Sequence, residues 1–130
     1  MSTDKQYQPR AKILVSDDDF NVRLLTRQCL EAEGMVVVEA SNRPETIDVF
    51  VRERPDLVFL DVEMPGMTGL EVCKRIREMP QGQSTPIMIV TGSDDRQSID
   101  QGFEAGATQY KTKPVNWSLL GRDVQYMLRA

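Results

Sequence analysis

The chain has 130 residues, a length that suits one domain with one hydrophobic core. Its formal net charge of −4 argues against a nucleic-acid-binding surface, because such surfaces are normally basic. The sequence contains no histidine, which excludes His-based nucleophilic triads, the common zinc sites and a phosphohistidine on this chain.

The first ten residues, MSTDKQYQPR, are polar and lack the apolar segment of a secretory signal. No apolar run approaches the roughly 18 residues that suggest a membrane span. We therefore expect a flexible segment at 1–10, one domain at 11–130, no membrane partner and a cytoplasmic location. Cys29 and Cys73 are isolated and lack metal-ligand spacing, so we expect them to be small buried residues in a reducing compartment.

Five short apolar runs are predicted to be strands. They are rich in Val and Ile and are bounded by Gly, Pro or acidic residues, as strands are. In chain order they are 11–16 (AKILVS), 35–40 (MVVVEA), 56–61 (DLVFLD), 86–92 (PIMIVTG) and the more polar 108–112 (TQYKT).

The segments between and after these runs show apolar residues at helical spacing. Each is predicted to be an amphipathic helix with one buried stripe. The expected stripes are Val22, Leu25, Cys29 and Ala32; Ile47, Phe50 and Val51; Val72, Cys73, Ile76 and Met79; Ile99 and Phe103; and Trp117, Leu120, Val124 and Met127.

The resulting order is strand then helix, repeated five times. Strands that alternate with helices of this length indicate βαβ units and a mostly parallel sheet with helices on both faces. Right-handed crossovers follow as the default. The predicted fold class is therefore α/β, a doubly wound (βα)5 sandwich.

Polar residues follow the apolar part of four of the five strands. They are Asp17, Asp18 and Asp19 after the first strand, Asp61 at the end of the third, Thr91 in the fourth and Lys113 after the fifth. In an open parallel sheet, ligands bind at the carboxyl ends of the strands. Carboxylates gathered there repel one another unless a cation lies between them. Oxygen ligands without histidine or thiolate favour Mg²⁺, with Mn²⁺ as a substitute.

The remaining groups at this edge suit a phosphate. Lys113 can pair with an anionic oxygen, Thr91 can donate a hydrogen bond, and backbone N–H groups near Val62 and Gly92 can do the same. A carboxylate such as Asp61 can act as the nucleophile that forms an aspartyl phosphate. Each residue alone also has a simpler interpretation, as a helix cap, a strand-end hydroxyl or a surface charge. Their joint position at four strand ends favours a shared metal-binding and phosphate-binding site over these separate interpretations.

The segments ILVSDDDFNVR, LVFLDVEMPGMTGLEV, PIMIVTG and YKTKP resemble the signature positions of a response-regulator receiver domain. The resemblance extends from residue 11 to about residue 128. It implies a flavodoxin-like fold with a five-stranded parallel sheet in the order 2-1-3-4-5. It also implies a signalling domain that catalyses only its own phosphoryl transfer and dephosphorylation.

The resemblance assigns roles to the acidic residues. Asp61 would be the phosphoacceptor and a metal ligand. Asp17 and Asp18 would be the acidic pair that holds Mg²⁺, and Asp19 would be a loop or cap residue. The main-chain carbonyl of Glu63 would be a further metal ligand.

It assigns the switch as well. Thr91 would bind a phosphoryl oxygen, Lys113 would form an ion pair, and Lys113–Pro114 would be a cis bond. Tyr110 would turn inward when Thr91 moves toward the phosphate. The phosphate would thereby favour one of two arrangements of the fourth helix, fifth strand and fifth helix. Tyr110 as a plain packing aromatic is the alternative.

The implied partners are a histidine kinase or histidine phosphotransfer protein as the phosphoryl donor, and an output domain or separate protein as the reader. The face formed by the fourth helix, fifth strand and fifth helix would dimerise or release a partner. The C-terminal KPVNWSLLGRDVQYMLRA resembles the last helix of receivers that precede diguanylate cyclases of the GGDEF type.

Three other functions are weighed against this one. A degenerate receiver would bind proteins without phosphorylation, but it would be expected to lack part of the acidic, Thr and Lys set. A haloacid-dehalogenase-like phosphatase would carry its nucleophile on the first strand, whereas Asp61 follows the third. A flavodoxin-like flavin binder would need a phosphate loop where SDDDFN would repel phosphate. Ser16 departs from the receiver pattern, which has an apolar residue just before the acidic pair.

Overall fold

The structure is a computed structural model that describes residues 10–62, 69–92 and 95–129. Its strands are β1 (Lys12–Ser16), β2 (Val36–Ala40), β3 (Leu57–Asp61), β4 (Ile87–Thr91) and β5 (Gln109–Thr112). Its helices are α2 (Phe20–Ala32), α3 (Arg43–Glu53), α4 (Gly69–Glu78), α5 (Arg96–Glu104) and α6 (Trp117–Arg129), with a short 3-10 helix η1 (Pro80–Gly82). The five predicted strands and five predicted helices are confirmed. None of the helices in these described ranges is long and apolar enough to cross a membrane.

The five strands form one parallel sheet in the order β2-β1-β3-β4-β5. This is the predicted 2-1-3-4-5 order. β3 lies at the centre, between β1 and β4, and all five of its residues are buried. The continuous apolar run of this strand is typical of a strand that is covered on both faces.

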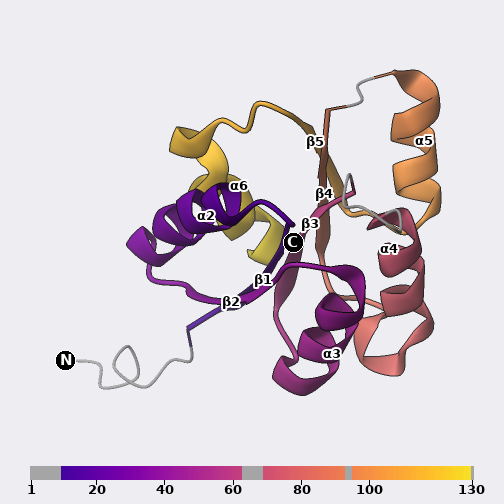
Figure 1. The fold of residues 1–130 in the computed structure, drawn as a ribbon, viewed down its shortest axis with the longest axis horizontal. Helices are drawn as coiled ribbons and strands as arrows, with labels where there is room; N and C mark the ends of the chain where they lie inside the picture. The colour runs from indigo at the N-terminus through magenta and orange to yellow at the C-terminus, as the bar shows by residue number, and fades with distance from the viewer. Residues whose placement is uncertain (1–9, 63–68, 93–94, 130) are drawn as a thin grey trace.

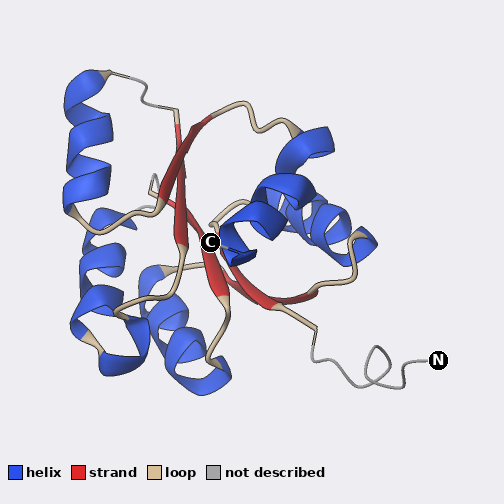
Figure 2. Cartoon of the chain, turned by 180° about the vertical axis from the view of Figure 1, so that it is seen from behind, coloured by secondary structure: helices blue, strands red, loops and turns tan. Residues whose placement is uncertain are grey.

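Helices cover both faces of the sheet. α2 and α6 pack on one face, while α3, α4 and α5 pack on the other, as two opposite views show (Figure 1 and Figure 2). Each face has its own buried apolar cluster. Leu30, Leu120 and Val124 bring α2 and α6 into one cluster, while Phe50 and Ile76 bring α3 and α4 into the other. The doubly wound arrangement is therefore confirmed.

Several expected helix faces are rotated relative to the prediction. Leu25, Val51 and Phe103 are each at least 45% exposed, and Ala32 is exposed as well. The buried positions of α2 and α3 include Thr26 and Thr46 instead. Their hydroxyls donate to the carbonyls of Val22 and Asn42, each at 2.7 Å. A buried threonine that is hydrogen-bonded in this way carries little polar penalty, so the apolar spacing alone was misleading.

Candidate functional site

The parallel sheet brings the predicted site residues to a single edge. Asp61 is the last residue of β3, and Asp17 directly follows the last residue of β1. Thr91 is the last residue of β4, and Lys113 directly follows β5. Because β1, β3, β4 and β5 are neighbours in that order, their carboxyl ends lie side by side.

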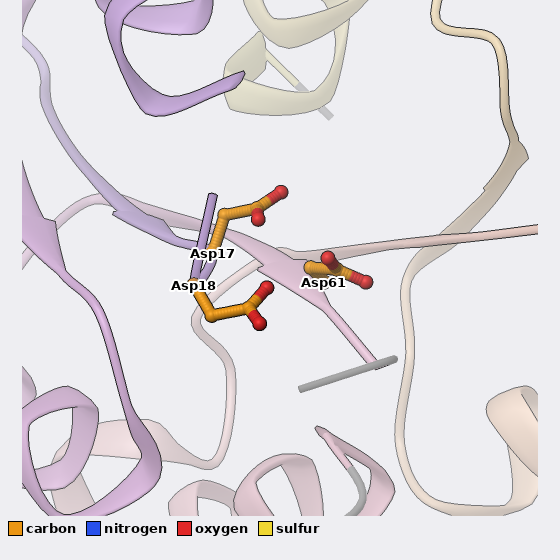
Figure 3. Close-up of side chains that lie close together, drawn as sticks. All are labelled: Asp17, Asp18 and Asp61. Atoms are coloured by element: carbon orange, nitrogen blue, oxygen red, sulfur yellow. The ribbon is translucent and has the colours of Figure 1, made fainter. Parts of the chain in front are cut away.

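Three carboxylates form a compact cluster at this edge. Asp17, Asp18 and Asp61 each offer one oxygen, and these oxygens all lie within 4.8 Å of one another. Figure 3 shows the three side chains at the ends of β1 and β3. Asp17 and Asp61 are each 1% exposed, whereas Asp18 is exposed. Two buried acids and one accessible acid therefore share one small volume.

The cluster is electrostatically strained. The pKa of Asp17 is raised from its usual 3.8 to about 7, chiefly by burial and in addition by repulsion from Asp61, while the hydrogen bond from Asp19 and the charge of Lys113 oppose the rise. Oδ2 of Asp17 is buried and has no hydrogen-bond partner within the part of the chain that the structure describes. A bound cation would stabilise the ionised form of Asp17 and would give its Oδ2 a partner. A donor set made only of oxygens suits Mg²⁺ or Mn²⁺. The residues present thus fit a divalent metal ion.

Lys113 approaches the cluster from the other side. Its Nζ lies 3.2 Å from Oδ2 of Asp61. Its main-chain N–H donates to the carbonyl of Thr91 at 2.8 Å, which holds the residue against the end of β4. The Lys113–Pro114 peptide bond is cis, as the family resemblance implied. Asp61 therefore has an acidic pair on one side and an ammonium group on the other.

The residues of the predicted switch lie next to the site. Thr91 is 2% exposed, at the end of β4. Tyr110 lies in β5, paired in register with Ile89 of β4, and is half-buried. Its ring packs against α5, where the ring centroid of Phe103 lies 6.2 Å away.

Ser16 is explained by a partner on the neighbouring helix. It is fully buried, and its Oγ lies 2.7 Å from Oγ1 of Thr46 in α3. The hydroxyl at this position is therefore hydrogen-bonded inside the core, which offsets the cost of burying it. The departure from the receiver pattern leaves the acidic pair intact.

Two predicted contributors are backbone groups that follow Asp61 in the chain. Glu63, whose carbonyl was expected to bind metal, lies outside the described residues. N–H groups near Val62 were expected to donate to a phosphate; the N–H of Val62 itself donates to the carbonyl of Val90 at 3.2 Å. That donor is therefore committed to the sheet. Asp19 has the predicted cap role, because its side chain accepts from Asn21 N and Val22 N at the start of α2.

Sequence reasoning missed one residue that contacts the site backbone. Arg23 in α2 donates from Nη1 to the main-chain carbonyl of Asp17 at 2.6 Å. Its Nε donates to Glu39 of β2 at 3.2 Å. The only available signal was an arginine one turn into the helix that follows the acidic residues. That signal does not distinguish a site residue from a surface charge.

The arrangement has a definite chemical capability. The Asp61 carboxylate can act as a nucleophile, and the adjacent acidic pair can hold a cation that neutralises an incoming anion. Lys113 offers a second positive group for the same anion. Such a set suits transfer of a phosphoryl group, whose negative charge must be neutralised as it moves.

Comparison with known proteins agrees with this chemistry. Residues 13–125 match the family model for the response regulator receiver domain. The chain is 38% identical over 120 residues to response regulator PleD of Caulobacter vibrioides, covering 92% of this chain but only 26% of PleD. It is 34% identical over 105 residues to sporulation initiation phosphotransferase F of Bacillus subtilis, covering 81% of this chain and 83% of that protein.

A solved structure gives the same result for the fold. The chemotaxis protein CheY4 of Vibrio cholerae superposes with a TM-score of 0.87 at 31% sequence identity, covering 92% of this chain and 99% of CheY4. The family match spans most of the chain and includes the strand ends that carry the acidic cluster, Thr91 and Lys113. This chain therefore belongs to the response regulator receiver domain family.

Proposed function

We propose that this chain is a phosphorylation-activated signalling switch in which Asp61 accepts the phosphoryl group. One observation carries the proposal: the buried Asp61 carboxylate lies between an acidic pair and the ammonium group of Lys113, 3.2 Å away. An oxygen of Asp61 forms a bond to phosphorus while the bond from phosphorus to the donor's nitrogen or oxygen breaks. The electron pair of the broken bond leaves with the donor group.

The residues of the cluster divide the remaining work. Asp17, Asp18 and Asp61 would hold Mg²⁺, together with the main-chain carbonyl of Glu63. When bound, this ion neutralises negative charge on the transferring phosphoryl group. Lys113 exchanges its carboxylate partner for a phosphoryl oxygen, and the hydroxyl of Thr91 donates to another. The chain thus acts as a switch that modifies itself rather than as an enzyme for a separate substrate.

The face formed by α5, β5 and α6 would transmit the change. Phe103 and Leu119 expose 47% and 45% of their surface on α5 and α6. A cavity of about 320 Å³, lined by both apolar and polar residues, lies beside β5, between Tyr110 and Leu119. Lys111 and Asp123 form an ion pair of 2.9 Å across the same face. These features support a surface where a second copy or an output partner docks when Tyr110 and Thr91 move.

The proposed phosphoryl donor is a histidine kinase or a histidine phosphotransfer protein, which places the chain in the cytoplasm with its donor. The similarity to a phosphotransferase supports a donor of this kind. For the output, we propose a diguanylate cyclase domain in a longer protein. The resemblance of the last helix supports that output. This chain spans about a quarter of the length of PleD, so most of that relative lies beyond the matched region.

Intact mass spectrometry tests the proposal. The chain is incubated with acetyl phosphate and Mg²⁺, and we expect the gain of one phosphoryl group. Asp61→Asn and a sample with excess EDTA should gain none. A folded wild-type chain that gains no phosphoryl group contradicts the proposal and favours a degenerate receiver. Steady hydrolysis of unrelated phosphate esters would favour a phosphatase instead.

A further inference from the structure

Arg23 lies at the meeting point of the acidic loop, α2 and β2. Its Nη1 donates to the main-chain carbonyl of Asp17 at 2.6 Å, and its Nε donates to Glu39 at 3.2 Å. Only 16% of its side chain is exposed. We propose that Arg23 is a positioning residue that holds Asp17 in its metal-binding orientation, with Glu39 cancelling its charge. The inference rests on the proposed metal-dependent function.

Asp17 needs this support because it lies just beyond the regular strand. The β1–β2 pairing ends at Ser16 and Ala40. Asp17 N–H donates to the carbonyl of Ala40 at 3.1 Å, and Oδ1 of Asp17 accepts from the N–H of Asp19 at 2.9 Å. Arg23 supplies the remaining main-chain partner. With its N–H, carbonyl and Oδ1 all bonded, Asp17 keeps Oδ2 as a buried oxygen that has no hydrogen-bond partner among the described residues.

A guanidinium group close to a cation site would normally oppose cation binding, because like charges repel. Glu39 removes this conflict. It pairs with Arg23 and also with Arg27, one turn further along α2. The guanidinium group of an arginine can donate hydrogen bonds to the carbonyl and to the carboxylate at the same time, which the single ammonium group of a lysine does poorly. The Arg23–Glu39 pair therefore orients Asp17 without adding net positive charge beside the metal.

Arg27 provides a matched control. It has the same charge, lies on the same helix and shares the same Glu39 partner. Its main-chain contact, however, is the carbonyl of Val37, the second residue of β2. A purely structural ion-pair network predicts similar consequences for loss of Arg23 and loss of Arg27. A positioning role predicts that only loss of Arg23 reaches the metal site.

The decisive measurement is the Mg²⁺ dissociation constant of Arg23→Gln, Arg27→Gln and the wild type by titration calorimetry. We expect Arg23→Gln to bind Mg²⁺ about tenfold more weakly, as for other residues that orient a metal ligand, and Arg27→Gln to bind it as the wild type does. The direction of the change in Mg²⁺ affinity separates positioning from simple charge repulsion. Removing a positive charge should strengthen cation binding if electrostatics alone acted, so weaker binding identifies positioning. Arg23→Lys, which keeps the charge, should recover part of the loss.

A second readout needs no metal. In the metal-free chain, we expect faster amide hydrogen exchange at Asp19 in Arg23→Gln, because its acceptor on Asp17 is less well held. Exchange at Asp19 should not change in Arg27→Gln. If Arg23→Gln binds Mg²⁺ as tightly as the wild type or more tightly, the inference is wrong while the metal site stands. A wild-type chain that does not bind Mg²⁺ contradicts the metal site and this inference together.

Discussion

Lys113 reaches across a whole strand to contact Asp61. Asp61 ends β3 and Lys113 follows β5, and β4 lies between these two strands. The side chain nevertheless places Nζ 3.2 Å from Oδ2 of Asp61, across 52 positions in the sequence. The sequence separation and the intervening strand make this contact sensitive to the whole edge of the sheet. It links the proposed phosphoacceptor to the strand that carries Tyr110.

Replacing Lys113 by Gln should slow phosphorylation of Asp61. Loss of a donor aimed at the developing charge typically lowers a rate on the order of 10²-fold. We expect a decrease of that size in the rate of modification by acetyl phosphate, followed by intact mass. Lys111→Gln is the matched control, since Lys111 is two residues away and pairs with Asp123 instead. Equal rates for Lys113→Gln and the wild type would remove Lys113 from the mechanism.

The metal-free chain should lose stability as the pH rises. The pKa of Asp17 is about 7 in the folded chain, against an ordinary value of 3.8, mainly because the group is buried. The folded state therefore holds its proton more tightly than the unfolded state does. The resulting stabilisation is fully present below pH 3.8 and is lost as the pH rises to about 7.

Urea unfolding in EDTA measures this dependence. We compare the wild type with Asp17→Asn, which cannot ionise at this position. The free energy of unfolding of Asp17→Asn minus that of the wild type should increase as the pH rises from 3.8 to about 7. Addition of Mg²⁺ at neutral pH should stabilise the wild type more than Asp17→Asn. A constant difference across the pH range would contradict the raised pKa.

Much of the site could be predicted because it depends on topology. Apolar runs mark the strands, and parallel strands necessarily bring their carboxyl ends to one edge. Asp17, Asp61, Thr91 and Lys113 could therefore be grouped without coordinates. The contacts of Arg23 could not be predicted from the topology. They depend on the side-chain conformation of one of the two arginines on α2, and no spacing rule specifies it.

The faces of the helices were harder to predict for a related reason. Adjacent apolar residues such as Leu24 and Leu25 allow more than one stripe at helical spacing, and both are exposed. The buried face of α2 includes Thr26, whose hydroxyl is satisfied within the helix. In α5 the buried residue is Gly102, whereas the large Phe103 next to it is exposed. Hydrophobicity alone therefore does not identify the face that packs.

Gly102 allows the ring of Tyr110 to pack against α5. A Cβ at position 102 would lie 2.8 Å from Cδ2 of Tyr110 and 2.9 Å from its Cε2. Alanine normally favours a helix interior over glycine by about 1 kcal/mol. Gly102→Ala should therefore stabilise the chain that carries Tyr110→Ala. It should not stabilise the chain that keeps Tyr110, because the new methyl group would force the ring to move. A urea double-mutant cycle on Gly102→Ala and Tyr110→Ala should give a coupling of about 1 kcal/mol or more. Additive effects would contradict the close packing.

Arg77 should matter for stability but not for metal binding. It donates to the carbonyls of Gly82, Thr85 and Gly106, at 2.7, 2.6 and 2.9 Å. These contacts join the end of α4 to the segments before β4 and β5, at the edge opposite the acidic cluster. Arg77→Ala should lower the free energy of unfolding by about 2–4 kcal/mol, because it leaves several carbonyls unpaired.

The control for this prediction is Arg75→Ala, since Arg75 is exposed on the same helix. It should change the stability little. Both variants should bind Mg²⁺ with the wild-type dissociation constant at a temperature where they are folded. A weaker Mg²⁺ affinity in Arg77→Ala alone would show that the two edges of the sheet are coupled.

Trapping the phosphorylated residue tests the central claim most directly. An aspartyl phosphate is reduced by borohydride to homoserine, so the acceptor keeps a permanent mark that peptide mass mapping can locate. After treatment with acetyl phosphate and Mg²⁺, we expect homoserine at position 61 and unmodified aspartate at positions 17 and 18. Homoserine at position 17 or 18, or an unmodified position 61 in a chain that has gained a phosphoryl group, would contradict the account.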